Sequence, residues 1–268
     1  MSHLISAEAL AQQGADCIFD CTFLLTDHDQ GRLQFDRGHI PGASYVDLNR
    51  DLSVAPDHRG RHPMPEREEF AQRVRSWGVN QQSKVVCYDQ DTGAFAARLW
   101  WMLRWLGHEE VYLLDGGRVV WEGAGFDLTT DTLRPEEGNF VPGPPLTRLC
   151  AAGELPDSSR VLLDARDERR FKGIEDPIDS VAGHIPGAVC ATFTDNLESG
   201  KFLSPEALRQ RFAALGVSGD VVCYCGSGVT ATHNILALLE AGFDEPALYP
   251  DSWSGWITDP TRPIARDE

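Results

Sequence analysis

A cysteine lies between a short apolar run and a helix-like segment in the second half of the chain. The run Val221–Tyr224 is too short and too β-branched for a helix core, which predicts a buried strand. The loop that follows, from Cys225 to Thr230, leads into a helix. Backbone N–H groups that converge at the start of a helix favour a thiolate over a thiol. We therefore predict that Cys225 is a nucleophile rather than a small buried hydrophobe, and that Cys223 belongs to the core.

Three sequence matches in the same order indicate an internal duplication. Val85–Tyr88 repeats the apolar run before Cys225, and Asp89 stands where the later copy has that cysteine. The other two matches are a Gly-His-Ile-Pro-Gly-Ala hexapeptide and a segment in which an aspartate precedes a tryptophan. They lie at Gly38–Ala43 and Gly183–Ala188, and at Leu113–Trp121 and Leu248–Trp256. One half of the chain has therefore kept a nucleophile that the other half lacks.

Short apolar runs alternate with helix-like stretches in both halves, which is typical of parallel strands joined by crossover helices. A helix start is indicated at Ser204-Pro205-Glu206, where an N-cap, a first-turn proline and an early acid follow one another. The predicted fold class is α/β, with two tandem domains that each contain a doubly wound, mainly parallel sheet flanked by helices. The clearest predicted strands are Val85–Tyr88, Val111–Leu114, Val161–Leu163 and Val221–Tyr224.

A stretch rich in proline and glycine separates the two halves and suits a linker. We predict an N-terminal domain over residues 1–134, a linker over 135–146 and a C-terminal catalytic domain over 147–268. The total of 268 residues agrees with two domains of ~100–200 residues each.

The composition agrees with a soluble enzyme, and we expect its cysteines to be reduced thiols in the cytoplasm. The net charge of −17 argues against nucleic acid or an anionic membrane as a partner, because both require a cationic surface. The seven cysteines lack the paired spacing of a zinc site, so we expect neither a metal nor another cofactor. The N-terminal residues do not resemble a secretory signal, and no apolar run approaches the ~20 residues of a membrane span.

These motifs resemble those of the rhodanese superfamily, and specifically of its tandem-domain sulfurtransferases. The resemblance covers nearly the whole chain, because the two His-Ile-Pro-Gly-Ala turns and the segment Arg98–His108 all look like family elements. Its most specific element is the loop Cys-Gly-Ser-Gly-Val-Thr at 225–230, followed by Ala231. The loop matches the form found in 3-mercaptopyruvate sulfurtransferases. Thiosulfate sulfurtransferases of the animal type usually carry basic residues at its second and third positions.

The resemblance implies that sulfur passes from 3-mercaptopyruvate to cyanide, a thiol or a protein thiol through a persulfide on Cys225. A thioredoxin-like reductant is a further candidate partner, and the domain with Asp89 would be catalytically silent. The family's substrate carboxylate is held by an arginine in an Arg-Phe-x-Gly motif, which falls on Arg170 here. Some relatives hold a second arginine a few residues later, where this chain reads Glu175–Asp179. The substrate-binding residues implied are Arg170, Gly226, Ser227, Gly228, Val229 and Thr230.

Other functions stay open to different degrees. A thiosulfate sulfurtransferase is the main alternative, although the loop itself offers a compact dianion only backbone N–H groups and a hydroxyl. A non-catalytic sulfur-carrier or interaction module is the second alternative. A phosphatase or arsenate reductase of related fold needs an arginine where this chain has Ala231, so we do not expect phosphoryl chemistry. His39 and His184 are expected to satisfy backbone carbonyls; for His39 the alternative is a relay with Ser227.

Overall fold

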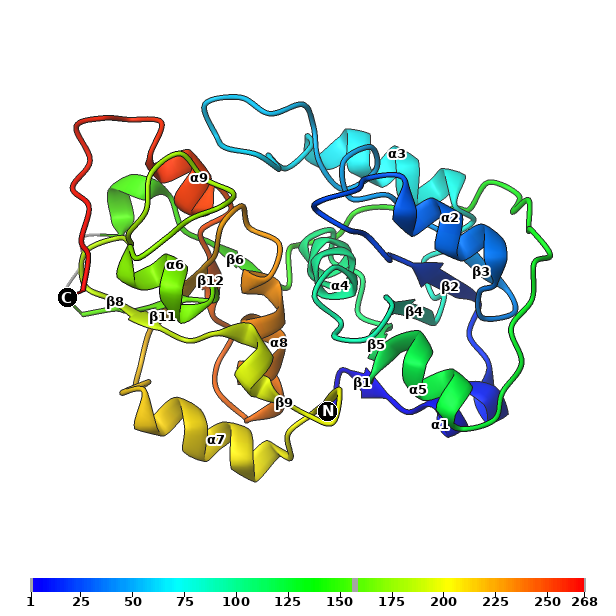
Figure 1. The fold of residues 1–268 in the computed structure, drawn as a ribbon. Helices are drawn as coiled ribbons and strands as arrows, with labels where there is room; N and C mark the ends of the chain where they lie inside the picture. The colour runs from blue at the N-terminus through cyan, green and yellow to red at the C-terminus, as the bar shows by residue number, and fades with distance from the viewer. Residues whose placement is uncertain (1, 156–158, 268) are drawn as a thin grey trace. The chain divides into compact units, whose positions relative to one another are not determined.

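Two five-stranded sheets of parallel strands organise the chain, and helices flank each sheet (Figure 1). The structure is a computed structural model that describes residues 2–155 and 159–267. In the described part of the chain, no helix is long and apolar enough to cross a membrane. The chain divides into two compact units. Unit 1 comprises Met1–Val54, Pro65–Leu146 and Ser199–Lys201, and unit 2 comprises Ala55–Met64, Thr147–Glu198 and Phe202–Glu268.

Unit 1 contains a sheet with the strand order β1-β5-β4-β2-β3, in which every neighbouring pair is parallel. Its strands are β1 (Leu4–Ile5), β2 (Cys17–Asp20), β3 (Ala43–Tyr45), β4 (Val85–Tyr88) and β5 (Val111–Leu114). Its helices are α1 (Ala7–Gln13), α2 (Gln30–Arg37), α3 (Arg67–Ser76), α4 (Ala96–Trp105) and α5 (Gly117–Gly123).

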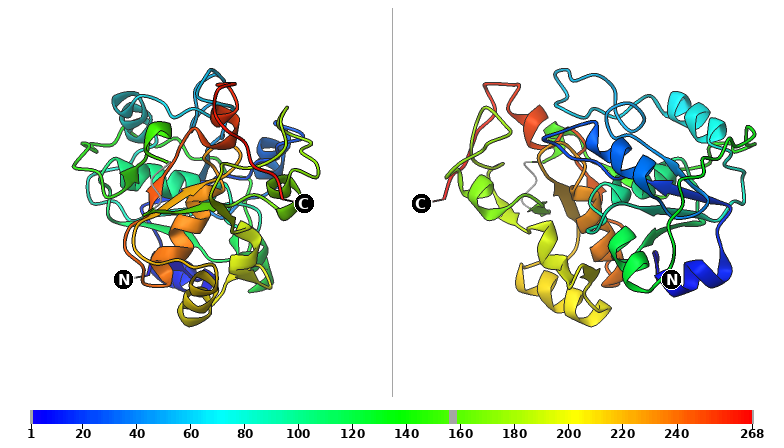
Figure 2. Two further views of the ribbon diagram at one scale, coloured as in Figure 1. Left: turned by 90° about the vertical axis from the view of Figure 1, so that its left-hand side faces the viewer. Right: turned by 45° about the vertical axis from the view of Figure 1, so that its right-hand side comes forward.

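Unit 2 repeats this topology, with the parallel order β6-β12-β11-β7-β8. Its five strands are β6 (Arg148–Leu149), β7 (Val161–Asp164), β8 (Ala188–Cys190), β11 (Val221–Tyr224) and β12 (Ala247–Leu248). Its helices are α6 (Glu168–Lys172), α7 (Pro205–Ala214), α8 (Ala231–Glu240) and α9 (Ser252–Trp256), with short 3-10 helices η1 (Ala152–Glu154) and η2 (Phe193–Asn196). A two-stranded sheet pairs β9 (Leu197–Glu198) with β10 (Lys201–Phe202). Two further views show the helices around both sheets (Figure 2). The predicted fold class is confirmed.

The central strands β4 and β11 are buried along their whole length, because helices cover a parallel sheet on both faces. This explains why both strands read as continuous apolar runs rather than as alternating sequences. In unit 2 the last residue of β11, Tyr224, lies opposite Asp164 at the end of β7. The loop that begins at Cys225 therefore leaves the carboxyl edge of the sheet, where open α/β folds bind their ligands.

The two hexapeptide turns are each fastened to a central strand in the same way. The N–H of Ile40 donates a hydrogen bond to the hydroxyl of Tyr88, at 3.2 Å. In unit 2 the N–H of Ile185 donates to the hydroxyl of Tyr224, also at 3.2 Å. In each unit, therefore, the tyrosine that ends the central strand holds the hexapeptide turn in place.

Residues 55–64 pack within unit 2, although they precede most of unit 1 in the sequence. The N–H of Arg61 donates to Oγ of Ser254 at 3.1 Å, and Oγ1 of Thr258 donates to the carbonyl of His58 at 2.8 Å. Gly60 has a left-handed φ of +111°, and a Cβ built there would lie 2.4 Å from the Ser254 oxygen. Only glycine fits this close approach, so the segment is fixed against the start of α9.

Candidate active site

Cys225 follows β11 directly and is 2% exposed. Helix α9 holds the backbone around it, because the N–H of Cys225 donates to Oγ of Ser252 at 3.1 Å and the N–H of Trp253 donates to the Cys225 carbonyl at 2.9 Å. The N–H of Ser254 donates to the carbonyl of Gly226 at 2.8 Å. Ser252 itself has a φ of +54°, a strained conformation of the kind found at functional sites. The start of the loop is thus rigidly held.

The rest of the loop curls into the start of α8. Gly228 has a left-handed φ of +77°, so glycine is required there for the turn. Val229 is buried, and its carbonyl accepts a hydrogen bond from Oγ1 of Thr232 at 2.7 Å. Thr230 precedes the helix as its N-cap residue. The predicted arrangement of strand, loop and helix is therefore present, and it directs the N-terminus of α8 toward the loop.

The corresponding loop of unit 1 carries a carboxylate where this loop carries a thiol. The carboxylate of Asp89 accepts hydrogen bonds of 2.8–3.3 Å from four backbone N–H groups, those of Asp91, Gly93, Phe95 and Ala96. Burial nevertheless raises the pKa of Asp89 to about 6, because loss of solvent outweighs these bonds. The four N–H groups therefore orient the carboxylate without compensating fully for the loss of solvent around its charge. Cys225 holds the equivalent position in the sequence of unit 2.

Ser227 lies beside a histidine that the sequence analysis did not identify. Nδ1 of His62 is 2.7 Å from Oγ of Ser227, and both residues are less than a tenth exposed. His62 belongs to the segment 55–64, so the hydrogen bond joins residues that are far apart in the sequence. A buried imidazole next to a hydroxyl can hold or transfer a proton. The only local signal was a histidine in the stretch Gly60–Pro63, which does not by itself indicate a partner.

Arg170 projects from α6 toward the loop, as the predicted binding role requires. Its Nε donates to Oδ1 of Asp176 at 3.0 Å, and its Nη2 donates to Oδ2 of Asp179 at 2.7 Å. The same Nη2 lies 3.3 Å from the point where Gly226 would carry a Cβ. The guanidinium therefore lies next to the residue that follows Cys225.

A second guanidinium, that of Arg61, reaches the same place from the segment 55–64. Its Nε donates to Oδ1 of Asp179 at 2.9 Å and its Nη2 donates to Oδ2 at 3.2 Å. The Nη2 atom lies only 2.6 Å from the ideal Cβ position of Gly226, so a side chain at this residue would displace the guanidinium. The loop carries no cation of its own, but two arginines lie beside it.

His39 and His184 have the structural environment that was expected of them. The ring nitrogens of His39 lie 2.9 Å from the carbonyl oxygen of Phe35 and 3.0 Å from that of Asp131. Nδ1 of His184 lies 2.8 Å from the carbonyl oxygen of Phe171. In the structure the partner of Ser227 is His62 rather than His39.

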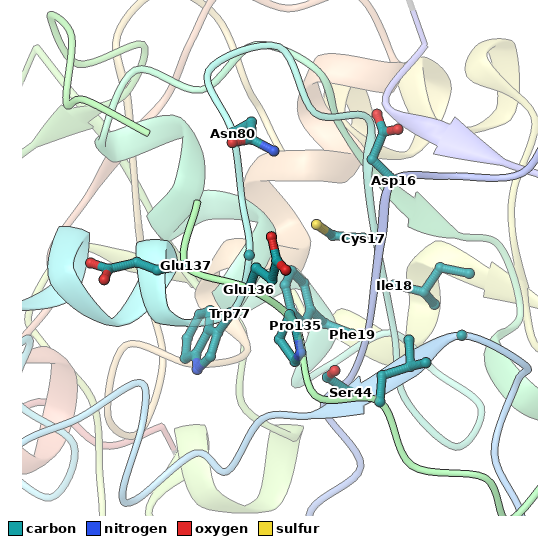
Figure 3. Close-up of a pocket in the computed structure, with 13 residues that line it drawn as sticks. Asp16, Cys17, Ile18, Phe19, Ser44, Trp77, Asn80, Pro135, Glu136 and Glu137 are labelled. Atoms are coloured by element: carbon teal, nitrogen blue, oxygen red, sulfur yellow. The ribbon is translucent and has the colours of Figure 1, made fainter. Parts of the chain in front are cut away.

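Two other thiols are poor candidates for the nucleophile. Burial raises the pKa of the Cys223 thiol, which lies within β11. A cavity of about 330 Å³ in unit 1 is lined by Cys17 together with Asp16, Trp77 and Glu136 (Figure 3). Burial raises the pKa of the Cys17 thiol to about 11, so it stays protonated at neutral pH. None of the predicted site residues lines this cavity.

All seven predicted site residues thus lie in the loop 225–230 of unit 2 or against it. Cys225, Gly226 and Ser227 start the loop, and Arg170 lies against Gly226. Gly228, Val229 and Thr230 complete the turn into α8. Among the residues that the structure describes, no group of three or more His, Cys, Asp or Glu side chains could hold a metal ion. The arrangement can bind an anionic molecule beside a thiol and exchange a proton through a hydroxyl and an imidazole.

Comparison with known proteins agrees with this arrangement. The profile of the family described as Rhodanese-like domain matches residues 6–124 and 150–259. A protein of Pseudomonas aeruginosa named "Probable 3-mercaptopyruvate sulfurtransferase" is 50% identical, over 98% of each chain. The thiosulfate sulfurtransferase of Gallus gallus is 34% identical over 90% of this chain and 86% of its own. The crystal structure of SseA from Escherichia coli, described as a 3-mercaptopyruvate sulfotransferase, superimposes with a TM-score of 0.84 at 30% identity, over 95% of this chain and all of that one.

The chain belongs to the rhodanese-like domain family, and it carries two such domains in tandem. The relatives described above are named as sulfurtransferases, and the expected class of enzyme, a sulfurtransferase, is confirmed.

Proposed function

We propose that this protein transfers sulfur from 3-mercaptopyruvate to a thiophilic acceptor through a persulfide on Cys225. The observation that carries the proposal is the convergence of three groups on the loop after β11: the Cys225 thiol, the Ser227–His62 hydrogen bond and the guanidinium of Arg170. The name of the Pseudomonas relative, half identical over its whole length, supports the choice of donor.

The first half-reaction forms the persulfide. The donor carboxylate binds Arg170, whose planar fork suits a carboxylate. The Cys225 thiolate then attacks the donor sulfur: an S–S bond forms, the C–S bond breaks, and its electron pair leaves with the carbon fragment as the enolate of pyruvate. That enolate needs a proton, and we assign its delivery to the Ser227 hydroxyl. His62 orients this hydroxyl and returns a proton to its oxygen. N–H groups of the loop stabilise the sulfur anion.

The second half-reaction discharges the persulfide. An acceptor nucleophile, such as cyanide, a small thiol or a protein thiol, attacks the outer sulfur, and the S–S bond electrons return to Cys225 as a thiolate. A thioredoxin-like protein is one candidate acceptor. In this mechanism unit 1 does not carry sulfur covalently, because Asp89 occupies the cysteine position and a carboxylate cannot form a persulfide.

Thiosulfate is the second candidate donor, and one observation favours it. Arg61 and Arg170 both lie against Gly226, so a sulfonate group bound at the loop would meet guanidinium charge after all. Thiosulfate sulfurtransferases are also among the similar proteins. The two donors share the persulfide, so they differ only in the first half-reaction.

Steady-state rates with both donors, measured with cyanide as the common acceptor, test the proposal. We expect ping-pong kinetics and a higher kcat/KM for 3-mercaptopyruvate. A wild-type protein that uses thiosulfate more efficiently would reverse the assignment of the donor and leave the persulfide step intact. Intersecting rather than parallel double-reciprocal lines would contradict the two-step mechanism itself.

A further inference from the structure

We propose that Asp179 is a specificity-determining residue, which holds Arg61 and Arg170 together beside Cys225 and sets the charge of the donor that the site accepts. The inference rests on the sulfurtransferase function proposed above. It adds a second arginine to the donor subsite and a carboxylate that selects monoanionic over dianionic sulfur donors.

Asp179 bridges the two guanidinium groups almost without contact with solvent. Its side chain is 3% exposed. Oδ1 accepts from Arg61 Nε at 2.9 Å, and Oδ2 accepts from Arg61 Nη2 at 3.2 Å and from Arg170 Nη2 at 2.7 Å. Both oxygens of this carboxylate therefore accept hydrogen bonds from a guanidinium group. The turn that carries it is fixed as well, because the N–H of Asp179 donates to Oδ1 of Asp176 at 2.9 Å.

This bridge lies close enough to the nucleophile to act on the donor. The Cβ position of Gly226 is 2.6 Å from Arg61 Nη2 and 3.3 Å from Arg170 Nη2. Gly226 is bonded directly to Cys225, so a donor whose sulfur touches the thiol presents its anionic group to the same two guanidinium groups. Arg61 thus completes a pair of arginines although it comes from a different part of the sequence.

The local charge of the bridge sums to zero. Arg61 and Arg170 contribute two positive charges, and Asp176 and Asp179 contribute two negative ones. The neighbouring Arg166 also pairs with Asp176, at 3.4 Å, and its charge is offset by that of Asp164, at 2.7 Å. A neutral cluster can still donate hydrogen bonds to one carboxylate. Because its net charge is zero, however, it does not attract a dianion more strongly than a monoanion. 3-Mercaptopyruvate carries one negative charge at its carboxylate, and thiosulfate carries two.

Removal of the Asp179 charge should therefore change donor preference in a defined direction. In Asp179→Asn the cluster gains a net charge of +1, and Coulomb attraction is twice as large for a dianion as for a monoanion. Two guanidinium groups also become available to the oxygens of the ligand. We expect the ratio of kcat/KM for thiosulfate to that for 3-mercaptopyruvate to rise about tenfold or more, and the rise to shrink at high salt.

Asp220→Asn is the matched control. Asp220 also joins two arginines of unit 2, with Arg148 Nη1 at 2.7 Å and Arg160 Nε at 3.0 Å. It lies immediately before β11, at the opposite end of the strand from Cys225. The control should leave the donor ratio at the wild-type value. An equal change of the ratio in both variants would overturn the proposal, because the effect would then be one of general charge.

Arg61→Gln provides a second variant that changes the charge in the opposite direction. The cluster then has a net charge of −1, so thiosulfate should lose more kcat/KM than 3-mercaptopyruvate. The proposal is overturned if the donor ratio does not move in opposite directions in Asp179→Asn and Arg61→Gln. Persulfide formation on wild-type Cys225 is measured separately, so failure of the proposed function is distinguished from failure of the specificity role.

Discussion

The hydrogen bond between Ser227 and His62 makes a prediction that separates the two donors. If Ser227 delivers the proton that the pyruvate enolate needs, Ser227→Ala removes that step for 3-mercaptopyruvate only. Thiosulfate releases sulfite, a stable anion that leaves without a proton. The two donors share the nucleophile and the loop, so a loss of rate in Ser227→Ala that is larger for 3-mercaptopyruvate than for thiosulfate reports on the proton that only the first donor requires.

The magnitude follows from the type of contact. Proton transfer by a positioned side chain contributes typically 10²–10⁴-fold to a rate. The 2.7 Å contact to a buried His62 is short enough to orient the hydroxyl, so we expect kcat for 3-mercaptopyruvate to fall by about a hundredfold or more in Ser227→Ala. That loss corresponds to ~2.7 kcal/mol of transition-state stabilisation. With thiosulfate the change should stay within about fivefold.

The assay is a double-mutant cycle with both donors. His62→Ala should resemble Ser227→Ala, and the double variant should be little worse than either single one, because residues that act as a unit are not additive. His58→Ala is the matched control: it lies in the same segment, its side chain is exposed, and its contact with Thr258 uses the backbone carbonyl. An equal loss with both donors, or two single effects that multiply in the double variant, would refute the proton-delivery role.

Two further predictions concern the charges of Arg170, on α6, and of Asp89, which follows β4. Arg170→Ala should lower kcat/KM for 3-mercaptopyruvate by about ten- to a hundredfold, as expected for loss of a charge-assisted contact of roughly 1.5–3 kcal/mol; unchanged donor kinetics would exclude a binding role. Burial raises the pKa of Asp89 to about 6, so the folded state binds a proton at this carboxyl group more tightly than the unfolded state does. The stability of the wild type should therefore fall, relative to Asp89→Asn, as the pH rises from about 4 to about 6, by up to about 3 kcal/mol in urea unfolding. Parallel pH profiles of the two proteins would show that the carboxyl group does not titrate there.

Local patterns were sufficient to predict much of the fold and the centre of the site. The β-branched run before Cys225 and the helix start at Ser204 depend on interactions between near neighbours, and both are present in the structure. The N-cap is a clear case, since Oγ of Ser204 accepts a hydrogen bond from the N–H of Ala207 at 3.3 Å. The internal repeat extended these local predictions to two similar sheets.

The residues that the sequence did not reveal reach the loop through long-range packing. His62 and Arg61 lie in a segment without helical or strand periodicity, and their partners Ser227 and Asp179 follow more than a hundred residues later. A single sequence contains no local pattern that predicts contacts between residues so far apart. The role of Gly226 was only partly predicted for the same reason: its lack of a side chain leaves room for the Arg61 guanidinium, whereas Gly228 has the left-handed backbone of the turn.

The central claim is that sulfur passes through Cys225, and the mass of the protein tests it most directly. After treatment with 3-mercaptopyruvate and removal of the excess, the intact protein should be heavier by one sulfur atom, and cyanide should restore the original mass. Peptide mapping should locate the added sulfur on Cys225. Cys190→Ser, which changes a half-buried thiol of the same unit, should behave like the wild type, and Cys225→Ser should gain no sulfur. Full activity of Cys225→Ser, or sulfur mapped to Cys223, would contradict the account.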